Sequence, residues 1–376
     1  MGAVDGEPWE MFTSISSLAF DEGGRLHIFD RLNQSLVRFG PDGRFQREFI
    51  RRGGGPGEIS MPSVTRVERD GTVAVMDVAR QALYWFYPEG ELMESAVVDP
   101  MRGDPMPAAP LHSHPDGGFV SAGTSLAFSG GRAPLGGTSM NSVPIHRFRL
   151  GEPTRTLFEA WRPTLSEDDL PTPPSGLGGT GGRGGMMVTH GAGVRAFDPT
   201  TSVGVLPDGR IIVSDSTAWT LKVVGLDGRL ERKLVRPFQP RGVTAQDRAA
   251  ERDRRRAQLD GGSGTRVQGG GGAPMMGLDE ASLRRRAEAR IEELRFAEEI
   301  PVVQEIRTDW EGRTWVLRTG PRPGVISATG VYLGTLPPDA TGLPLAFGPG
   351  GLAAFVEVDE LDVPSVVVRR ISLDPR

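Results

Sequence analysis

A pair of histidines two residues apart is the strongest candidate for metal chemistry in this chain. His112 and His114 fall in a short segment that is predicted to be a β-strand, where alternate side chains point to the same face. Imidazole binds zinc and copper well, but such a site needs a third ligand. The remaining histidines, His27, His146 and His190, are the candidates, and His190 lies outside any predicted strand. Partly exposed strand histidines are the simpler interpretation, and a metal site is the alternative.

Three aspartates recur at one position of a repeated phrase. Asp30, Asp77 and Asp215 each end an apolar strand that follows a turn rich in Asp, Glu and Gly. Three carboxylates around an axis would suit Ca²⁺, which binds six to eight oxygens. The equivalent places further along the chain hold Gly123, Arg318 and a residue near Val356. An Asp at a strand end commonly caps the following turn, so the sequence favours a structural role.

Two further segments contain candidate binding residues. Arg51 and Arg52 precede a glycine-rich stretch whose backbone N–H groups could hold an anion. The stretch lacks the Gly-Lys-Ser/Thr of a phosphate loop, and Glu58 would repel an anion, so a turn between repeats is favoured. Trp85 lies in the aromatic run 84–87, which would be either a partner surface or, as the sequence favours, part of the core.

Composition excludes several classes of function. The chain of 376 residues has no cysteine, which excludes disulfides, zinc–thiolate sites and cysteine nucleophiles. A net charge of −5 argues against nucleic acid as a partner. No Gly-x-Ser-x-Gly motif marks a serine nucleophile, so no catalytic residue is assigned. No apolar run approaches the length of about 18 residues that a membrane-spanning helix needs, and no signal peptide is visible in the chain as written.

The elements that must position these residues come from an internal repeat. An apolar strand, a turn and a second apolar strand recur at 18–30, 67–77, 205–215 and 308–318. Short strands in repeats of about 40–50 residues are typical of a β-propeller with one four-stranded blade per repeat. We therefore predict an all-β fold, a single six-bladed β-propeller of antiparallel blades over residues 1–376. The predicted blades span about 15–50, 64–98, 111–160, 201–236, 302–336 and 343–373.

The repeat is interrupted in four places. Residues 123–144 form a long gap within the third blade, and the Gly/Pro-rich stretch 171–185 is predicted to be flexible. Between blades four and five, residues 244–300 are predicted to be a helical insertion, with helices at 244–260 and 278–300. An apolar stripe on the second helix is expected to pack on the propeller rim: Leu283, Ala287, Ile291 and Leu294. The sixth blade shows three strands, and we expect the natural chain to begin further upstream and to supply a leader and a closing strand.

Several short sequences resemble a known group of proteins. They are the segment 54–58 before an inner strand, its variant at 6–10, and the end of the insertion at 294–301, which leads into 310–316. With the repeat, they resemble six-bladed NHL-like propellers and, more narrowly, exported bacterial propeller proteins of unassigned function. The resemblance implies a periplasmic or extracellular location. Relatives of this kind include scaffolds, lactonases and lyases, so the resemblance indicates the fold and not the activity.

The favoured interpretation is a non-catalytic propeller scaffold that binds a protein or a small-molecule ligand at the mouth of its channel. No cofactor is predicted. One alternative is a metal-dependent, lactonase-like hydrolase or lyase that uses channel-facing His and Asp side chains with a divalent metal. A second alternative is a structural subunit of a cell-envelope assembly, with the helical insertion as its docking element.

Overall fold

The structure is a computed structural model. It describes residues 1–2, 6–51, 53, 55, 57–99, 102–122, 125–128, 142–164, 186–189, 195–260, 280–319, 323–336, 342–359 and 363–371. The predicted flexible stretch 171–185 and residues His190 and Arg52 lie outside this described part.

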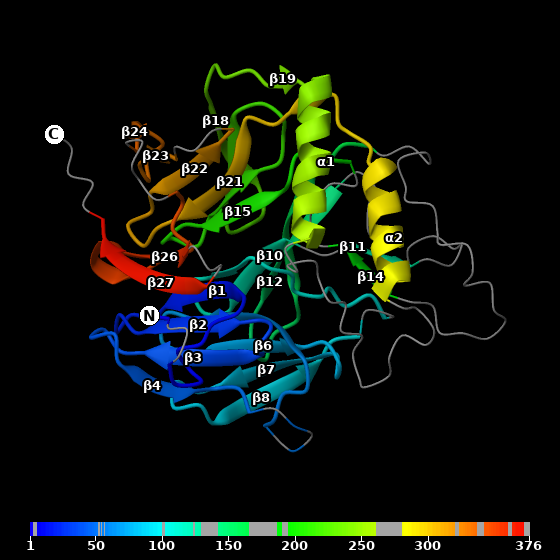
Figure 1. Cartoon of the computed structure of the whole chain (residues 1–376). Helices are drawn as coiled ribbons and strands as arrows, with labels where there is room; N and C mark the ends of the chain where they lie inside the picture. The colour runs from blue at the N-terminus through cyan, green and yellow to red at the C-terminus, as the bar shows by residue number, and fades with distance from the viewer. Residues whose placement is uncertain are drawn as a thin grey trace.

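The strands form six antiparallel blades, as the sequence predicted (Figure 1). Blade one contains β1 (Ile15–Phe20), β2 (Leu26–Asp30), β3 (Ser35–Phe39) and β4 (Phe45–Glu48). Blade two contains β5 (Pro62–Val67), β6 (Val73–Asp77), β7 (Ala82–Phe86) and β8 (Leu92–Val97). Blade three contains β9 (Leu111–Ser113), β10 (Phe119–Ala122), β12 (Ser142–Phe148) and β13 (Arg155–Trp161).

The remaining blades follow after the Gly/Pro-rich stretch. Blade four contains β15 (Ser202–Val205), β16 (Ile211–Ser214), β17 (Thr220–Val224) and β18 (Leu230–Val235). Blade five contains β21 (Val303–Thr308), β22 (Thr314–Arg318), β23 (Gly324–Ile326) and β24 (Tyr332–Thr335). Blade six contains β25 (Ala346–Phe347), β26 (Leu352–Val358) and β27 (Pro364–Arg370).

One tight turn recurs between the first and second strands of every blade, and we call it the inner turn. In each, the N–H of the first turn residue donates to the carbonyl of the residue four positions later. The glycine in the fourth position of the blade-two turn, Gly71, has a φ of 94°, which other residues adopt only with strain. The first residues of the six inner turns are Asp21, Glu68, His114, Leu206, Asp309 and Gly348.

The blades close into a ring. The first strands of blades one to five contact one another in chain order, and β25 contacts β1. Blades five and six are joined where Arg307 donates to the carbonyl of Pro344 at 2.9 Å. Met1 exchanges two backbone hydrogen bonds with Val366, of 2.9 and 2.7 Å, and so lies beside β27 in the place of a fourth strand. From the sequence, only three strands were predicted in blade six.

The core consists of apolar clusters between neighbouring blades. Phe20 of blade one packs with Ala354 of blade six, and similar clusters join each of the pairs from one–two to four–five. Between blades five and six, the rings of Trp315 and Phe347 lie 5.1 Å apart. Burial of apolar area between blades, rather than within one blade, therefore holds the ring together.

All the long interruptions leave the same face of the ring. The inner turns lie at one end of the strands. The second turns, which join the second and third strands of each blade, and the connections between blades therefore lie at the other end. The helices α1 (Ala245–Asp260) and α2 (Glu280–Glu292) lie in such a connection, and Figure 1 shows them near β11 (Ser125–Phe128) and β14 (Met186–Thr189). The pairing of β11 with β14 was not predicted, because the sequence suggested only a loop there.

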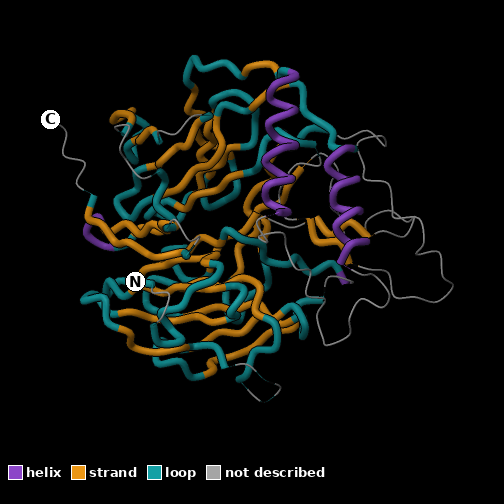
Figure 2. The backbone as a smooth tube through the Cα atoms, viewed as in Figure 1, coloured by secondary structure: helices purple, strands orange, loops and turns teal. Residues whose placement is uncertain are grey.

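The helical insertion is anchored at both ends. Its base is a two-stranded sheet of β19 (Arg241–Gly242) and β20 (Glu299–Ile300), so the second helix is shorter than the predicted 278–300 (Figure 2). Ile291 is buried, and Ala196 exchanges backbone bonds with the segment after α2, accepting from Ala297 at 2.9 Å. The C-terminal part of the predicted stripe therefore faces inward.

The recurring aspartates join each second turn to the segment that leads into the first strand. Asp30 accepts hydrogen bonds from the N–H groups of Ser14 at 3.2 Å and Leu32 at 3.0 Å. Asp77 does the same with Ser60 at 2.7 Å and Ala79 at 3.0 Å. These carboxylates satisfy buried backbone donors, which is the role that the sequence favoured.

We expect Asp30→Ala to lower the free energy of unfolding by about 3 kcal/mol, because several buried N–H groups lose a charged acceptor. The matched control is Asp42→Ala, in an exposed turn where Asp42 accepts only from the N–H of Arg44. It should change stability by no more than about 0.5 kcal/mol. Denaturant titration at pH 7 measures both, and equal losses in the two variants would contradict the structural role.

Candidate functional site

The shared inner turn places equivalent residues of the six blades at the same level of the ring. The residue two positions before each turn is therefore a good place to look for convergent side chains. On three blades this residue is small, and on the other three it is an arginine or a histidine. We call this set the Arg–His level: Ala19, Arg66, His112, Gly204, Arg307 and Ala346.

The three polar members lie deep in the ring and yet are only half-buried. Arg66 follows Thr65 and precedes Val67, which are both buried, and His112 follows the buried Leu111. Arg307 is likewise half-buried beside the buried Ile306. The first strands of neighbouring blades contact one another, so these residues lie around the axis of the ring.

Arg66 carries a positive charge without an ion pair. Its Nε donates to the Ser113 hydroxyl at 2.6 Å and its Nη1 to the Leu111 carbonyl at 3.1 Å, and both partners are neutral. Burial lowers the pKa of Arg66 to about 10, with Glu68 opposing the shift and Arg69 adding to it. The guanidinium is therefore charged at neutral pH. Desolvating a charge without a counter-ion is costly, which makes this group a candidate for ligand binding.

Arg307 approaches from the blade opposite Arg66. Its Nε donates to Glu305 at 2.7 Å, and its Nη1 donates to the Pro344 carbonyl at 2.9 Å. Glu305 thus balances the charge of Arg307. The positive charge of Arg66 has no such partner among the described residues.

His112 is the third polar member of the level. Its Nε2 is buried and has no hydrogen-bond partner among the described residues. Burial and, to a smaller extent, the nearby positive charges of Arg66 and Arg307 together lower the pKa of His112 to about 3. The ring is therefore neutral at physiological pH and offers one N–H donor. The two guanidinium groups also make this a poor place for a cation.

The channel is closed on the side of the inner turns. The Cζ of Arg69, in the turn of blade two, lies 4.6 Å from the ring centroid of Trp310, in the turn of blade five. Blades two and five are opposite in a ring of six, so this cation–π contact crosses the axis. A ligand would therefore reach the Arg–His level from the opposite face, where the insertions lie.

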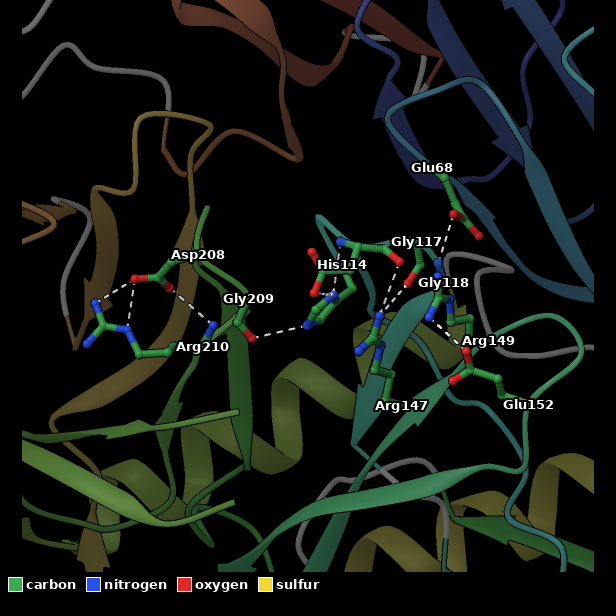
Figure 3. A network of polar contacts seen from close by, with 11 residues as sticks. Glu68, His114, Gly117, Gly118, Arg147, Arg149, Glu152, Asp208, Gly209 and Arg210 are labelled. Carbon is green, nitrogen blue, oxygen red and sulfur yellow. Dashed lines mark hydrogen bonds and ion pairs between the residues drawn. The ribbon is translucent and has the colours of Figure 1, made fainter. Parts of the chain in front are cut away.

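A polar seam joins blades two, three and four beside this closure (Figure 3). Glu68 accepts from the N–H of Gly118 at 2.8 Å. The Nε2 of His114 lies 3.2 Å from the carbonyl of Gly209, and its Nδ1 accepts from the N–H of Asp116 at 3.2 Å. Both ring nitrogens of His114 are used if the imidazole is neutral with its proton on Nε2.

The predicted metal ligands are not brought together. His114 lies in the seam and His112 at the Arg–His level, while the carboxylates of Asp30, Asp77 and Asp215 lie at the other end of the strands. Asp215 accepts from the N–H of Trp161 and from Lys222. In the part of the chain that the structure describes, no group of three metal-binding side chains is found. His190 is outside that part.

The predicted binding residues also lie apart from the channel level. Arg51 is exposed, and its carbonyl accepts from Ile59 at 2.9 Å. Trp85 is 4% exposed and packs in the core between blades two and three. The sequence analysis did not select Arg66 or Arg307. Each of these arginines lies two positions before the acidic residue that opens its inner turn. This shared spacing is the sequence signal that could have identified them.

Comparison with known proteins adds little beyond the fold. No known protein family and no curated protein matches this chain. Among solved structures, virginiamycin B lyase from Staphylococcus aureus is similar at 11% identity, with 96% of this chain and 86% of that chain covered and a TM-score of 0.41. A putative exported protein from Bacteroides fragilis is similar at 10% identity, with 89% of this chain and 74% of that chain covered and a TM-score of 0.43. A gluconolactonase from Xanthomonas campestris is similar at 13% identity, with 94% of this chain and 82% of that chain covered and a TM-score of 0.41.

The class of this protein is therefore defined by its own sheet order, as a six-bladed β-propeller with a helical insertion. The similarities are too weak to assign an activity. Among the helices that the structure describes, none is both long and apolar enough to cross a membrane.

The burial of His112 predicts a defined acid sensitivity. In the unfolded chain this histidine takes up a proton below a pH of about 6.5, whereas the folded protein resists protonation down to about 3. Between these two pH values the unfolded state thus binds more protons than the folded state. The free energy of unfolding therefore decreases as the pH is lowered, by at most about 1.4 kcal/mol per pH unit. His112→Gln should remove this contribution. Denaturant titrations from pH 7 to pH 4 should give a shallower slope for the variant, and parallel curves would refute the assignment.

Proposed function

We propose that this protein is a non-catalytic binding propeller that holds an anionic small molecule in its channel at the Arg–His level. The observation that carries the proposal is the half-buried Arg66, whose hydrogen-bond partners among the described residues are neutral. Its charge acts on His112, whose Nε2 has no hydrogen-bond partner among those residues. An arginine whose remaining N–H groups face the channel can bind a carboxylate or a phosphate through two parallel hydrogen bonds.

The surroundings support an anion rather than a cation or a neutral ligand. Arg66 and Arg307 both act on His112, while Glu305 balances only one of these two charges. The other members of the level, such as Ala19 and Ala346, add no charge. An anion would supply the missing counter-charge and an acceptor for a histidine N–H. Because neutral His112 is a donor at only one nitrogen, its tautomer would adapt to the ligand.

The route to this level is also consistent with binding. Arg69 and Trp310 close the inner-turn side, and the insertions surround the opposite face. Loops on a rigid ring can adapt to a ligand while the ring keeps its donors in place. Resemblance to exported propellers supports an extracytoplasmic location as part of this proposal. Fractionation that finds the native protein in the cytoplasm would contradict that part.

We expect small anions to bind and stabilise the protein, and Arg66→Gln to weaken this binding at least tenfold, because a charge-assisted pair is replaced by a neutral one. Calorimetric titration with succinate and with glycerol 3-phosphate distinguishes a carboxylate ligand from a phosphate ligand. Glycerol serves as the neutral comparison, and low ionic strength limits screening.

The matched control is Arg44→Gln, because the side chain of Arg44 is 88% exposed in a turn of blade one. This variant should bind like the wild type. Equal affinity of the wild type and Arg66→Gln for every anion, or binding of neither anion class by the wild type, would overturn the proposal.

A further inference from the structure

Two arginines that form no ion pair with the described residues lie away from the channel, between blades four and five. A surface pocket there is lined by two guanidinium groups, three aromatic rings and a glycine. We call it the Arg–aromatic groove, and its defining residues are Trp219, Arg236, Phe238, Arg318, Gly324 and Tyr332.

The two arginines are stacked on aromatic rings. The Cζ of Arg236 lies 3.9 Å from the ring centroid of Tyr332 and 6.0 Å from that of Phe238. The Cζ of Arg318 lies 4.5 Å from the same Phe238 ring. Rings that cover the faces of a guanidinium hold it in place and leave the N–H groups at its edge available to an acceptor.

Neither arginine has an ion pair or a side-chain hydrogen bond among the described residues. Other arginines nearby in the sequence do: Arg241 pairs with Asp247, and Arg210 pairs with Asp208 and Glu231. The chain carries 48 acidic residues against 43 basic ones, so two neighbouring arginines without a carboxylate are a local departure from the balance of the whole molecule. The groove is thus complementary to negative charge.

Two aromatic rings of the groove are partly exposed to solvent. Phe238 is 38% exposed and Tyr332 is 40% exposed. Arginine and aromatic residues that lie together in a partly apolar setting are the residue types that dominate binding energy at protein interfaces.

We propose that the Arg–aromatic groove binds an acidic peptide segment of a partner protein. A Glu or Asp carboxylate accepts hydrogen bonds from Arg236 and Arg318, and flanking apolar side chains cover Phe238 and Tyr332. This site is separate from the channel and does not depend on the anion proposed there. A peptide is favoured over a small anion because the exposed rings of Phe238 and Tyr332 lie beside the charges, and a small anion would leave them uncovered.

The test is selection of displayed random peptides on the folded protein, followed by fluorescence anisotropy with the selected peptides. We expect selected sequences to be enriched in Glu or Asp next to apolar residues. Replacing those acids by Gln or Asn in a selected peptide should weaken binding at least tenfold. Arg236→Gln and Arg318→Gln should each have a similar effect, and Arg236→Lys should restore only part of the affinity, because lysine keeps the charge without the planar edge.

The matched control is Arg229→Gln, since the side chain of Arg229 is 87% exposed in a turn of the same blade. It should bind the peptides like the wild type, and circular dichroism should show all variants folded. Selection without acidic enrichment, or retention of the peptides by the double variant of Arg236 and Arg318, would show the proposal to be wrong. Binding of succinate or glycerol 3-phosphate in the channel is measured on the same variants and should be unchanged, which separates the two sites.

Discussion

One backbone hydrogen bond, repeated at the inner turn of every blade, sets the geometry on which the rest of the structure depends. It fixes the register of the first two strands, and in a β-sheet a slip of one residue would send each side chain to the other face. Because all six turns share it, residues at one offset from the turn lie at one level of the ring. Arg66, His112 and Arg307 come together through this repetition and not through proximity in sequence.

The carboxylates at the turns of the blades have partners within the protein. Asp30 and Asp77 are committed to backbone N–H groups at the second turns, and Asp309 accepts from the indole of Trp315 at 2.8 Å. Carboxylates that satisfy buried backbone donors stabilise the blades, and some of them also pair with a cation, as Asp215 does with Lys222. Arg66 forms no ion pair within the described residues, and Glu68 is the carboxylate that acts on its charge, so we propose an external anion as its direct partner.

The two ends of the ring have different roles. At the inner-turn end, short connections and the contact between Arg69 and Trp310 close the axis. At the opposite end, the connections are long and include α1, α2 and the pair β11–β14. Insertions are tolerated there because they leave the shared inner turns untouched, so the scaffold stays constant while one face varies.

The sequence by itself determined the propeller, most strand limits and the turn-capping role of Asp30 and Asp77, because these depend on alternation and turn chemistry within a few residues. It also placed Trp85 in the core. The alternation of the histidine pair did not show where each ring would lie, since His114 opens a turn and its Nε2 contacts the carbonyl of Gly209 in the next blade. Only the tertiary structure decided which charges lack a partner. A missing ion pair at Arg66 is a property of everything that surrounds it in space, and residues distant in sequence supply those surroundings.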